Sequence, residues 1–275
     1  MWYNRPMKTF MKWAGNKSSI VEKIAPCLVG ETLIEPFAGS CAVSLNTNFK
    51  KYICNDINAD MINMYQLIQK NPTEFIKSSQ DFFLNGNEET RFYELRELYN
   101  NTSDKNLKSA LFLYLNRHCF NGLCRYNSKG KFNVPFGKFT APYFPVKEII
   151  EFHNYTKNNF EFLNEDFSEL FKQADENTVI YCDPPYLPLT DTADFSKYST
   201  NDFSIKEHLQ LRDLAIQYSK ERSCTVVISN HDTKDIRDIY KDADDIISFD
   251  VKRTIASKAE NRKNAPELLA IYKGK

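Results

Sequence analysis

The sequence predicts an α/β fold in which a mostly parallel sheet is covered by helices on both faces. Short apolar runs, each ending in a polar or turn residue, alternate with segments of helical periodicity. This alternation is typical of parallel sheets, because parallel strands need long crossover connections. The last two apolar runs lie too close together for a helix to fit between them. They therefore predict an antiparallel hairpin at the end of the sheet.

The individual elements follow from these patterns in chain order. Buried strands are expected at 32–37, 51–56, 160–166, 178–183 and 225–230, and the terminal hairpin at 245–253 and 267–273. Helices beside the sheet are expected at 17–28, 205–221 and 233–240. Ser204 and Glu207 have the spacing of a capping box at the start of the helix 205–221.

The middle of the chain predicts an all-helical insertion between the second and third strands. Helical segments are expected at 59–70, 71–83, 88–100 and 104–119, and Asn71 with Pro72 forms a helix start. The glycines and prolines of 120–144 predict an exposed loop or β-hairpin. We therefore expect a discontinuous domain, 1–57 and 146–275, interrupted by a second domain at 58–145 with a hairpin at about 119–140.

Composition narrows the class of protein. The chain has 275 residues, of which 42% are hydrophobic and 14% aromatic, enough for a sizeable core. No apolar run approaches the roughly 20 residues that span a bilayer, and the basic N-terminus lacks the apolar region of a signal peptide. The seven cysteines are scattered without zinc-site spacing. We expect a cytoplasmic protein with reduced thiols, no membrane association and no metal.

The net charge of zero conceals one basic segment. Between Arg117 and Lys147 there are six lysines and arginines, seven phenylalanines and tyrosines, and no acidic residue. Basic side chains interleaved with aromatic rings are typical of a surface that binds phosphates and bases. A solvated basic loop with ordinary core aromatics explains the same composition, and composition alone favours neither interpretation.

Polar residues gather where the predicted strands end. Ligands of open parallel sheets bind beyond the carboxyl ends of the strands, so these positions predict a site. The residues concerned are Glu35-Pro36-Phe37, Gly39, Asp56, Asp166, Asp183-Pro184-Pro185-Tyr186 and Asn230-His231.

The stretch "IEPFAGSCAVSLN" predicts a strand, a tight turn at Gly39 and a helix. It has neither the glycine pattern of a pyrophosphate site nor the lysine of a P-loop. Asp56 ends the next strand, where a carboxylate can hold two ribose hydroxyls. A nucleoside cofactor without phosphate, such as S-adenosylmethionine, fits this pattern, and "KWAGNK" near the start could bind its amino acid end. An ordinary turn and a surface acid remain the alternative for each piece.

The stretch "VIYCDPPYLP" ends a predicted buried strand in an acid, two prolines and an aromatic ring. Neither proline has an N–H to continue the ladder, so the strand must stop there. The exocyclic amine of a base becomes more nucleophilic when both its N–H groups donate hydrogen bonds. Asp183 and the carbonyl of Pro184 can supply the two acceptors, and Tyr186 a face for an extruded base. A rigid loop with a capping aspartate is the less favoured alternative.

Six motifs resemble those of the Dam-type DNA adenine-N6 methyltransferases in order and spacing, across nearly the whole chain. They are "FMKWAGNKSSIV", "LIEPFAGSCAVSLN", "YICNDIN", "NRHCFNGLCRYNSKGKFNVPFGKFTAPYFP", "VIYCDPPY" and "VISNHDT". The resemblance implies a Rossmann-like methyltransferase domain with S-adenosylmethionine as methyl donor and S-adenosylhomocysteine as product. It also implies a flipped adenine, duplex DNA with the site GATC, and a target-recognition domain made of the helical insertion and the basic hairpin.

The matching positions, together with the strand ends and the basic segment, predict roles for single residues. Catalytic roles fall on Asp183, Pro184, Pro185 and Tyr186. Cofactor contacts fall on Trp13, Ala14, Gly15, Lys17, Glu35, Pro36, Phe37, Gly39, Asp56, Asp166 and Asp183. DNA contacts fall on Lys12, Arg117, Phe120, Asn121, Leu123, Arg125, Asn127, Pro135, Lys138 and His231. Arg125 also has a physical rationale, because arginine bidentate to guanine is the commonest base-specific contact. Phe120 and Leu123 match the family's wedge between bases, for which local packing is the alternative.

Some positions depart from the family pattern, namely Asn16 for a glycine, Phe120 for a tyrosine, and His118-Cys119. The segment 187–203 is expected to close over the site as a lid.

Two other functions fit parts of the sequence. One is a methyltransferase of another amine, such as that of protein glutamine, in which the corresponding corner typically begins with asparagine. The other is a DNA-binding module without catalytic activity. We expect a monomer without an obligate protein partner. A solitary methylase, a restriction enzyme's partner and a phage-encoded enzyme all fit the sequence.

Overall fold

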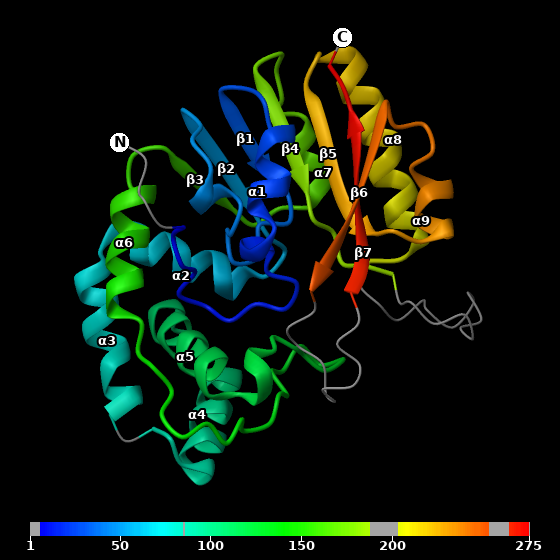
Figure 1. Ribbon diagram of the computed structural model, residues 1–275. Coiled ribbons are helices and arrows are strands. Elements are labelled where there is room, and N and C mark those ends of the chain that lie inside the picture. The colour runs from blue at the N-terminus through cyan, green and yellow to red at the C-terminus, as the bar shows by residue number, and fades with distance from the viewer. Residues whose placement is uncertain (1–5, 85, 188–202, 253–263, 275) are drawn as a thin grey trace. The chain divides into compact units, whose positions relative to one another are not determined.

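The computed structural model describes residues 6–84, 86–187, 203–252 and 264–274. Within them lies one sheet of seven strands in the order β3-β2-β1-β4-β5-β7-β6 (Figure 1), which confirms the α/β class. The strands are β1 Thr32–Glu35, β2 Lys51–Asn55, β3 Phe160–Leu163, β4 Thr178–Cys182, β5 Thr225–His231, β6 Asp245–Lys252 and β7 Asn264–Tyr272.

The pairing of the strands confirms a parallel centre with an antiparallel end. Strand β1 pairs in parallel with both β2 and β4, and β4 pairs in parallel with β5. Strand β7 is antiparallel to β5 and to β6, which is the predicted terminal hairpin. All five residues of β4 are buried. This continuous buried run is typical of a parallel strand with both faces covered, and it ends directly before Asp183.

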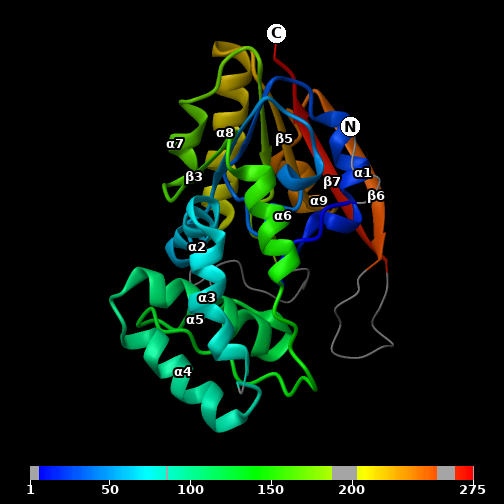
Figure 2. The ribbon, with the colours of Figure 1, turned by 90° about the vertical axis from the view of Figure 1, so that its left-hand side faces the viewer.

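The helical insertion between β2 and β3 is confirmed. Asn71 accepts a hydrogen bond from the amide of Glu74, and α3 begins at Pro72, as predicted. Helices α3 and α4 pack against α5 (Figure 2), whose run Leu111–Leu115 is fully buried. The helices of the insertion and its flank are α2 Ala59–Lys70, α3 Pro72–Leu84, α4 Glu89–Asn101, α5 Lys105–His118 and α6 Val146–Thr156. The remaining ones are α1 Val21–Ile24, α7 Phe167–Phe171, α8 Ile205–Glu221 and α9 Lys234–Ile239.

Two predicted helices are wrong. The segment 17–28 holds two 3-10 turns, Lys17–Ser19 and Ala25–Cys27, around the four-residue α1. Pro26 lies in the second turn and has no N–H for a helical hydrogen bond. After β1, a 3-10 turn at Ser44–Asn46 replaces the expected helix. Cys41 there has a φ of 57°, in the left-handed region that a right-handed helix cannot contain.

The contacts divide the chain into two compact units. Unit 1 comprises residues 1–21, 38–48 and 56–164, and unit 2 comprises 22–37, 49–55 and 165–275. The predicted domains, 1–57 with 146–275 and 58–145, stay a prediction. The predicted lid at 187–203 lies, apart from its two end residues, outside the described residues. In the part of the chain that the structure describes, every helix is too short or too polar to cross a lipid bilayer.

Candidate active site

Asp183 follows β4 and is half-buried, with its carboxylate held from the neighbouring strand. The hydroxyl of Ser229 on β5 donates to Oδ1 of Asp183 at 2.9 Å, and the hydroxyl of Tyr181 donates to Ser229 at 3.1 Å. Ser229 and Tyr181, which the sequence did not predict as site residues, therefore orient the predicted catalytic acid. The register that pairs Cys182 with Ile228 is what brings Ser229 opposite Asp183.

The ring of Tyr186 is packed in place beside this acid. Its hydroxyl donates to Oε2 of Glu267 at 3.4 Å, and the ring meets that of His231 edge to face, with centroids 4.4 Å apart. Burial, together with the charges of Asp183 and Glu267, raises the pKa of Tyr186, so its hydroxyl stays neutral. His231, predicted to contact DNA, thus contacts Tyr186, and the buried Glu267 was not predicted. Two prolines lie between Asp183 and Tyr186: Pro184 is buried and Pro185 is exposed.

The other predicted residues of unit 2 lie at the end of β1, directly after β1, or after β3. Glu35 is buried at the end of β1, and the carbonyl of Pro36 accepts a hydrogen bond of 3.0 Å from the side chain of Asn55. Phe37 packs against the rings of Phe167 and Phe203, each with its centroid 5.3 Å away. Asp166 is exposed and caps α7, accepting from the amide of Ser168 at 3.0 Å.

In unit 1 the structure brings Trp13, Gly39 and Asp56 together. The amide of Gly39 donates to Oδ2 of Asp56 at 3.0 Å. Gly39 has a φ of +48°, and a Cβ on it would lie 2.5 Å from Nε1 of Trp13, so only glycine fits. Burial raises the pKa of Asp56, while hydrogen bonds from the amides of Asn58 and Gly39 oppose this shift. A hydrogen bond therefore joins the Gly39 turn to Asp56, the acid predicted to hold the ribose.

The loop "KWAGNK" contacts this turn through Asn16. Its side-chain nitrogen donates to Oγ1 of Thr9 at 3.1 Å and to Oγ of Ser40 at 2.8 Å. Ala14 and Gly15 are exposed, and the ammonium group of the buried Lys17 donates to the carbonyl of Gly15 at 3.0 Å. The side chain that departs from the family pattern thus joins the two loops predicted to hold the cofactor.

Unit 1 also fits a nucleoside ligand chemically. The carboxylate of Asp56 can accept hydrogen bonds from ribose hydroxyls. The next residue, Ile57, is 77% exposed, which leaves an apolar side chain beside that acid for a planar base. Exposed backbone at Ala14 and Gly15 offers polar groups to an amino acid.

Lys12 is anchored to the helical insertion by the buried Asn116. The side chain of Asn116 accepts from the amide of Lys12 at 2.9 Å and donates to its carbonyl at 2.7 Å. It also donates to the carbonyl of Gly122 at 3.2 Å. The ammonium group of Lys12 lies 3.5 Å from the ring centroid of Phe139. Burial, followed by the charge of Arg117, lowers the pKa of Lys12. Asn116 was not predicted, because its partner lies 104 residues away.

The segment 119–140 is a loop closed by two isolated antiparallel bridges, Cys119–Phe136 and Tyr126–Phe132, rather than a regular ladder. The predicted hairpin is thus present in outline. Phe120 is 49% exposed, and Asn121, also exposed, has a φ of 54°. Leu123 is half-buried. An exposed phenylalanine in a polar loop is a side chain available for a wedge.

Arg125 is exposed on this loop, and its guanidinium is held by one neighbour. Nε donates to Oδ1 of Asn133 at 2.7 Å and Nη2 to the carbonyl of Asn133 at 3.3 Å.

Asn127 forms the turn at the tip of the loop. Its side-chain oxygen accepts from the amides of Lys129 and Lys131 at 2.9 and 3.0 Å. Its contacts are therefore those of a residue that shapes the loop.

Three further predicted DNA contacts lie around the same segment. Pro135 is exposed, and its carbonyl accepts from the amide of Phe120 at 2.8 Å. Lys138 is exposed with a φ of 52°. Arg117 is half-buried and donates from Nε to the carbonyl of Tyr143 at 3.0 Å. Among the described residues, no cluster of His, Cys, Asp and Glu could hold a metal ion.

Comparisons with known proteins agree with the resemblance read from the motifs. A family model described as D12 class N6 adenine-specific DNA methyltransferase matches residues 13–255. The DNA adenine methylase of Serratia marcescens is 43% identical over 268 residues, covering 97% of this chain and 98% of that protein. That of Escherichia coli strain K12 is 41% identical over 268 residues, covering 97% and 95%. That of Vibrio cholerae serotype O1, strain O395, is 41% identical over 270 residues, covering 98% and 97%.

The match of the family model and the relatives' coverage together confirm the predicted family and activity. The chain belongs to the D12 class of N6 adenine-specific DNA methyltransferases and is an S-adenosylmethionine-dependent enzyme that methylates adenine in DNA.

Proposed function

We propose that this enzyme methylates N6 of an adenine flipped out of duplex DNA, within the site GATC, on a Rossmann-like methyltransferase domain that carries residues 58–145 as its target-recognition domain. The observation that carries the proposal is the fixed carboxylate of Asp183, directly after a buried strand and beside the packed ring of Tyr186. An acceptor, a rigid proline corner and a stacking face are the groups that an extruded adenine needs.

Asp183 accepts a hydrogen bond from one N–H of the adenine amine, and the carbonyl of Pro184 accepts from the other. These two bonds favour a tetrahedral nitrogen with a localised lone pair. Pro184 and Pro185 fix the backbone, so the carbonyl keeps its direction. Asp183 then accepts the proton that leaves the amine, and Tyr186 stacks on the ring. S-adenosylmethionine supplies the electrophilic methyl group.

Cofactor contacts are proposed within each unit by itself. In unit 1, Asp56 binds the ribose hydroxyls, and Trp13, Ala14, Gly15 and Lys17 bind the amino acid end. In unit 2, the proposed cofactor contacts are Glu35, Pro36, Phe37 and Asp166. The hydrogen bond between Gly39 and Asp56 and the bridge from Asn16 to Ser40 support the first assignment, because each fixes one loop against another.

Target reading is assigned to the basic loop. Arg125 binds a guanine by two hydrogen bonds, Lys12 and Pro135 contact neighbouring base pairs, and Phe120 with Leu123 fills the space beside the extruded adenine. The exposure of Phe120 and Arg125 supports this assignment. The remaining proposed DNA contacts are Arg117, Asn121, Lys138 and His231. The hydrogen bonds that Asn127 makes within the turn support a role for this residue in shaping the loop.

Expression in a methylation-deficient host tests the proposal, with modified adenines mapped by sequencing. We expect methylation at nearly every GATC and at no other frequent site. The Asp183→Ala variant should leave the genome unmodified while its purified form still binds cofactor and DNA. Methylation by this variant, or a different mapped site, would overturn the corresponding part of the proposal.

A further inference from the structure

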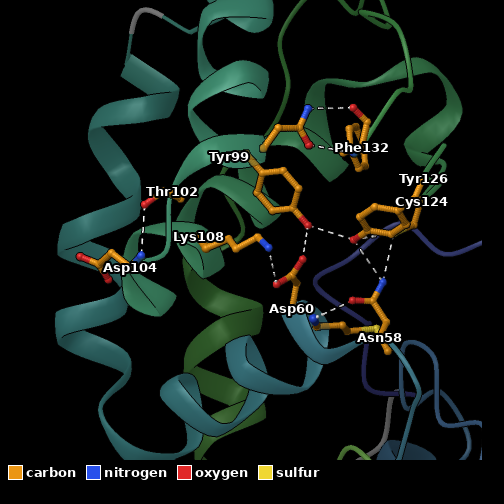
Figure 3. Close-up of polar contacts among 11 residues, drawn as sticks. Asn58, Asp60, Tyr99, Thr102, Asp104, Lys108, Cys124, Tyr126 and Phe132 are labelled. Carbon is orange, nitrogen blue, oxygen red and sulfur yellow. Dashed lines mark hydrogen bonds and ion pairs between the residues drawn. The ribbon is translucent and has the colours of Figure 1, made fainter. Parts of the chain in front are cut away.

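The two residues that flank Arg125 belong to a partly buried chain of hydrogen bonds (Figure 3). The side-chain nitrogen of Asn58 donates to Sγ of Cys124 at 3.3 Å and to the hydroxyl of Tyr126 at 3.4 Å. The hydroxyls of Tyr126 and Tyr99 are 2.9 Å apart, and Tyr99 donates to Asp60. Asp60 forms an ion pair with Lys108 on α5, N to O 3.2 Å.

The direction of each hydrogen bond in this chain follows from counting protons. Tyr99 has one hydroxyl proton, and it goes to Asp60. Tyr126 must therefore donate to Tyr99 and accept from Asn58. Burial raises the pKa of Tyr99 and of Tyr126 above that of a free tyrosine, so both hydroxyls keep their protons. The side-chain hydrogen-bonding groups of this network are therefore paired. A fully paired polar network specifies one arrangement of the segments that it joins.

Asn58 occupies a junction in unit 1. Its side-chain oxygen caps α2 by accepting from the amide of Met61 at 3.1 Å, and its own amide donates to Oδ1 of Asp56 at 3.0 Å. The residue that holds the flanks of Arg125 is therefore bonded to the acid assigned to the cofactor. On the opposite side of the loop, the amide of Asn133 donates to the carbonyl of Arg125 at 3.1 Å.

We propose that Tyr126 and Asn58 are positioning residues for target recognition, which fix the backbone of Arg125 so that its guanidinium meets one guanine edge in plane. The proposal rests on the proposed function, in which Arg125 reads that guanine. A bidentate contact between arginine and guanine needs both hydrogen bonds aligned at once. Small rotations of the Arg125 backbone therefore weaken this base contact selectively. A contact to a phosphate would tolerate the same rotations.

The variant Tyr126→Phe tests this proposal. It removes the hydroxyl and keeps the ring, which packs edge to face on Phe132 with centroids 5.9 Å apart. The measurement is the ratio of kcat/KM at GATC to that at sites with one guanine replaced. The variant loses both hydrogen bonds of the hydroxyl, the one donated to Tyr99 and the one accepted from Asn58. We expect the ratio to fall by at least about three- to tenfold, the effect of losing one hydrogen bond. Asn58→Ser, which keeps a good helix cap and loses the side-chain nitrogen, should lower the same ratio.

The matched control is Tyr114→Phe. Tyr114 is buried on α5 and donates to the carbonyl of Gly86, so this variant loses a tyrosine hydroxyl outside the hydrogen-bond chain that holds Arg125. We expect it to lower the melting temperature and to leave the ratio unchanged.

Arg125→Ala distinguishes failure of this inference from failure of the proposed function. If Arg125→Ala lowers the ratio and Tyr126→Phe does not, the inference is overturned and the reading role of Arg125 stands. If Arg125→Ala slows methylation equally at all sites, the reading role fails and the inference fails with it. In the double variant, the second substitution should lower the ratio no further than Arg125→Ala alone. A further fall would show that Tyr126 does not act through Arg125.

Discussion

Ser229 donates a hydrogen bond of 2.9 Å to Oδ1 of Asp183, across the parallel pair formed by β4 and β5. The same hydroxyl accepts from Tyr181, so its direction toward the carboxylate is fixed from behind. An acid that must accept a hydrogen bond from an amine gains from a defined orientation of its remaining oxygen. Ser229 is therefore a positioning residue for the proposed reaction.

Ser229→Ala should lower kcat about tenfold or more with little change in the KM for DNA. The variant removes a hydrogen bond to a charged group, a class worth about 1.5–3 kcal/mol. Single-turnover methylation of a duplex oligonucleotide measures the effect. Ser79→Ala is the matched control, since Ser79 is fully buried and donates to the carbonyl of Phe75. Equal rates for the two variants would contradict the positioning role.

The relationship between Ser229 and Asp183 shows where sequence patterns stop being sufficient. The strand that ends before Asp183 and the strand that contains Ser229 were both predicted from apolar runs. Which residue faces which depends on strand register, and register is a property of the assembled sheet. Glu267, beside Tyr186, comes from the antiparallel β7 and was missed for the same reason. Motifs predict the reacting groups, and tertiary contacts supply the residues that orient them.

The helices show a similar division between local and tertiary causes. The bounds of α2, α3, α4 and α5 were predicted to within one residue, because strong periodicity and end signals such as Asn71-Pro72 are local. Helix α6, Val146–Thr156, was not predicted, although it too has an apolar face. The expected helix after Gly39 is absent because Cys41 adopts a left-handed φ. The residue types in that turn do not predict a left-handed conformation at Cys41.

Asn16→Ala should raise the KM for S-adenosylmethionine about three- to tenfold and leave the KM for DNA unchanged. The side chain donates to Thr9 and Ser40 and accepts from the amide of Ser18. Its removal therefore loses three hydrogen bonds and frees the first loop from the Gly39 turn. Titration with the cofactor, followed by tryptophan fluorescence or calorimetry, measures the change. Asn101→Ala serves as control for cofactor affinity, because Asn101 is exposed and its side chain donates to Glu97 of α4 and accepts from Lys131. An unchanged affinity for the cofactor would exclude this role of Asn16.

Gly122→Ala should reduce kcat/KM for DNA more than tenfold. A Cβ there would lie 2.3 Å from Cβ of Lys12, so Lys12 or the loop must move. Gly130→Ala is a close control: Gly130 has a φ of +70°, near the +65° of Gly122, but no atom lies within 4 Å of its added Cβ. Both variants incur left-handed strain of roughly 1–2 kcal/mol, and only Gly122→Ala also displaces Lys12. Steady-state methylation of a GATC duplex compares them, and equal losses would mean that strain alone is responsible.

Binding to DNA should weaken steeply with salt although the chain has no net charge. Each phosphate that the basic loop neutralises releases counterions, and the logarithm of affinity falls by about 0.9 per contact for each tenfold rise in salt. Lys129, exposed near the loop tip, is a candidate contact, so Lys129→Gln should reduce that slope by about one. Lys172→Gln changes an exposed lysine of unit 2 paired with Glu169 and should leave it unchanged. Fluorescence anisotropy between about 50 and 200 mM salt measures both slopes, and a flat response would contradict assignment of the 117–147 segment to the DNA backbone.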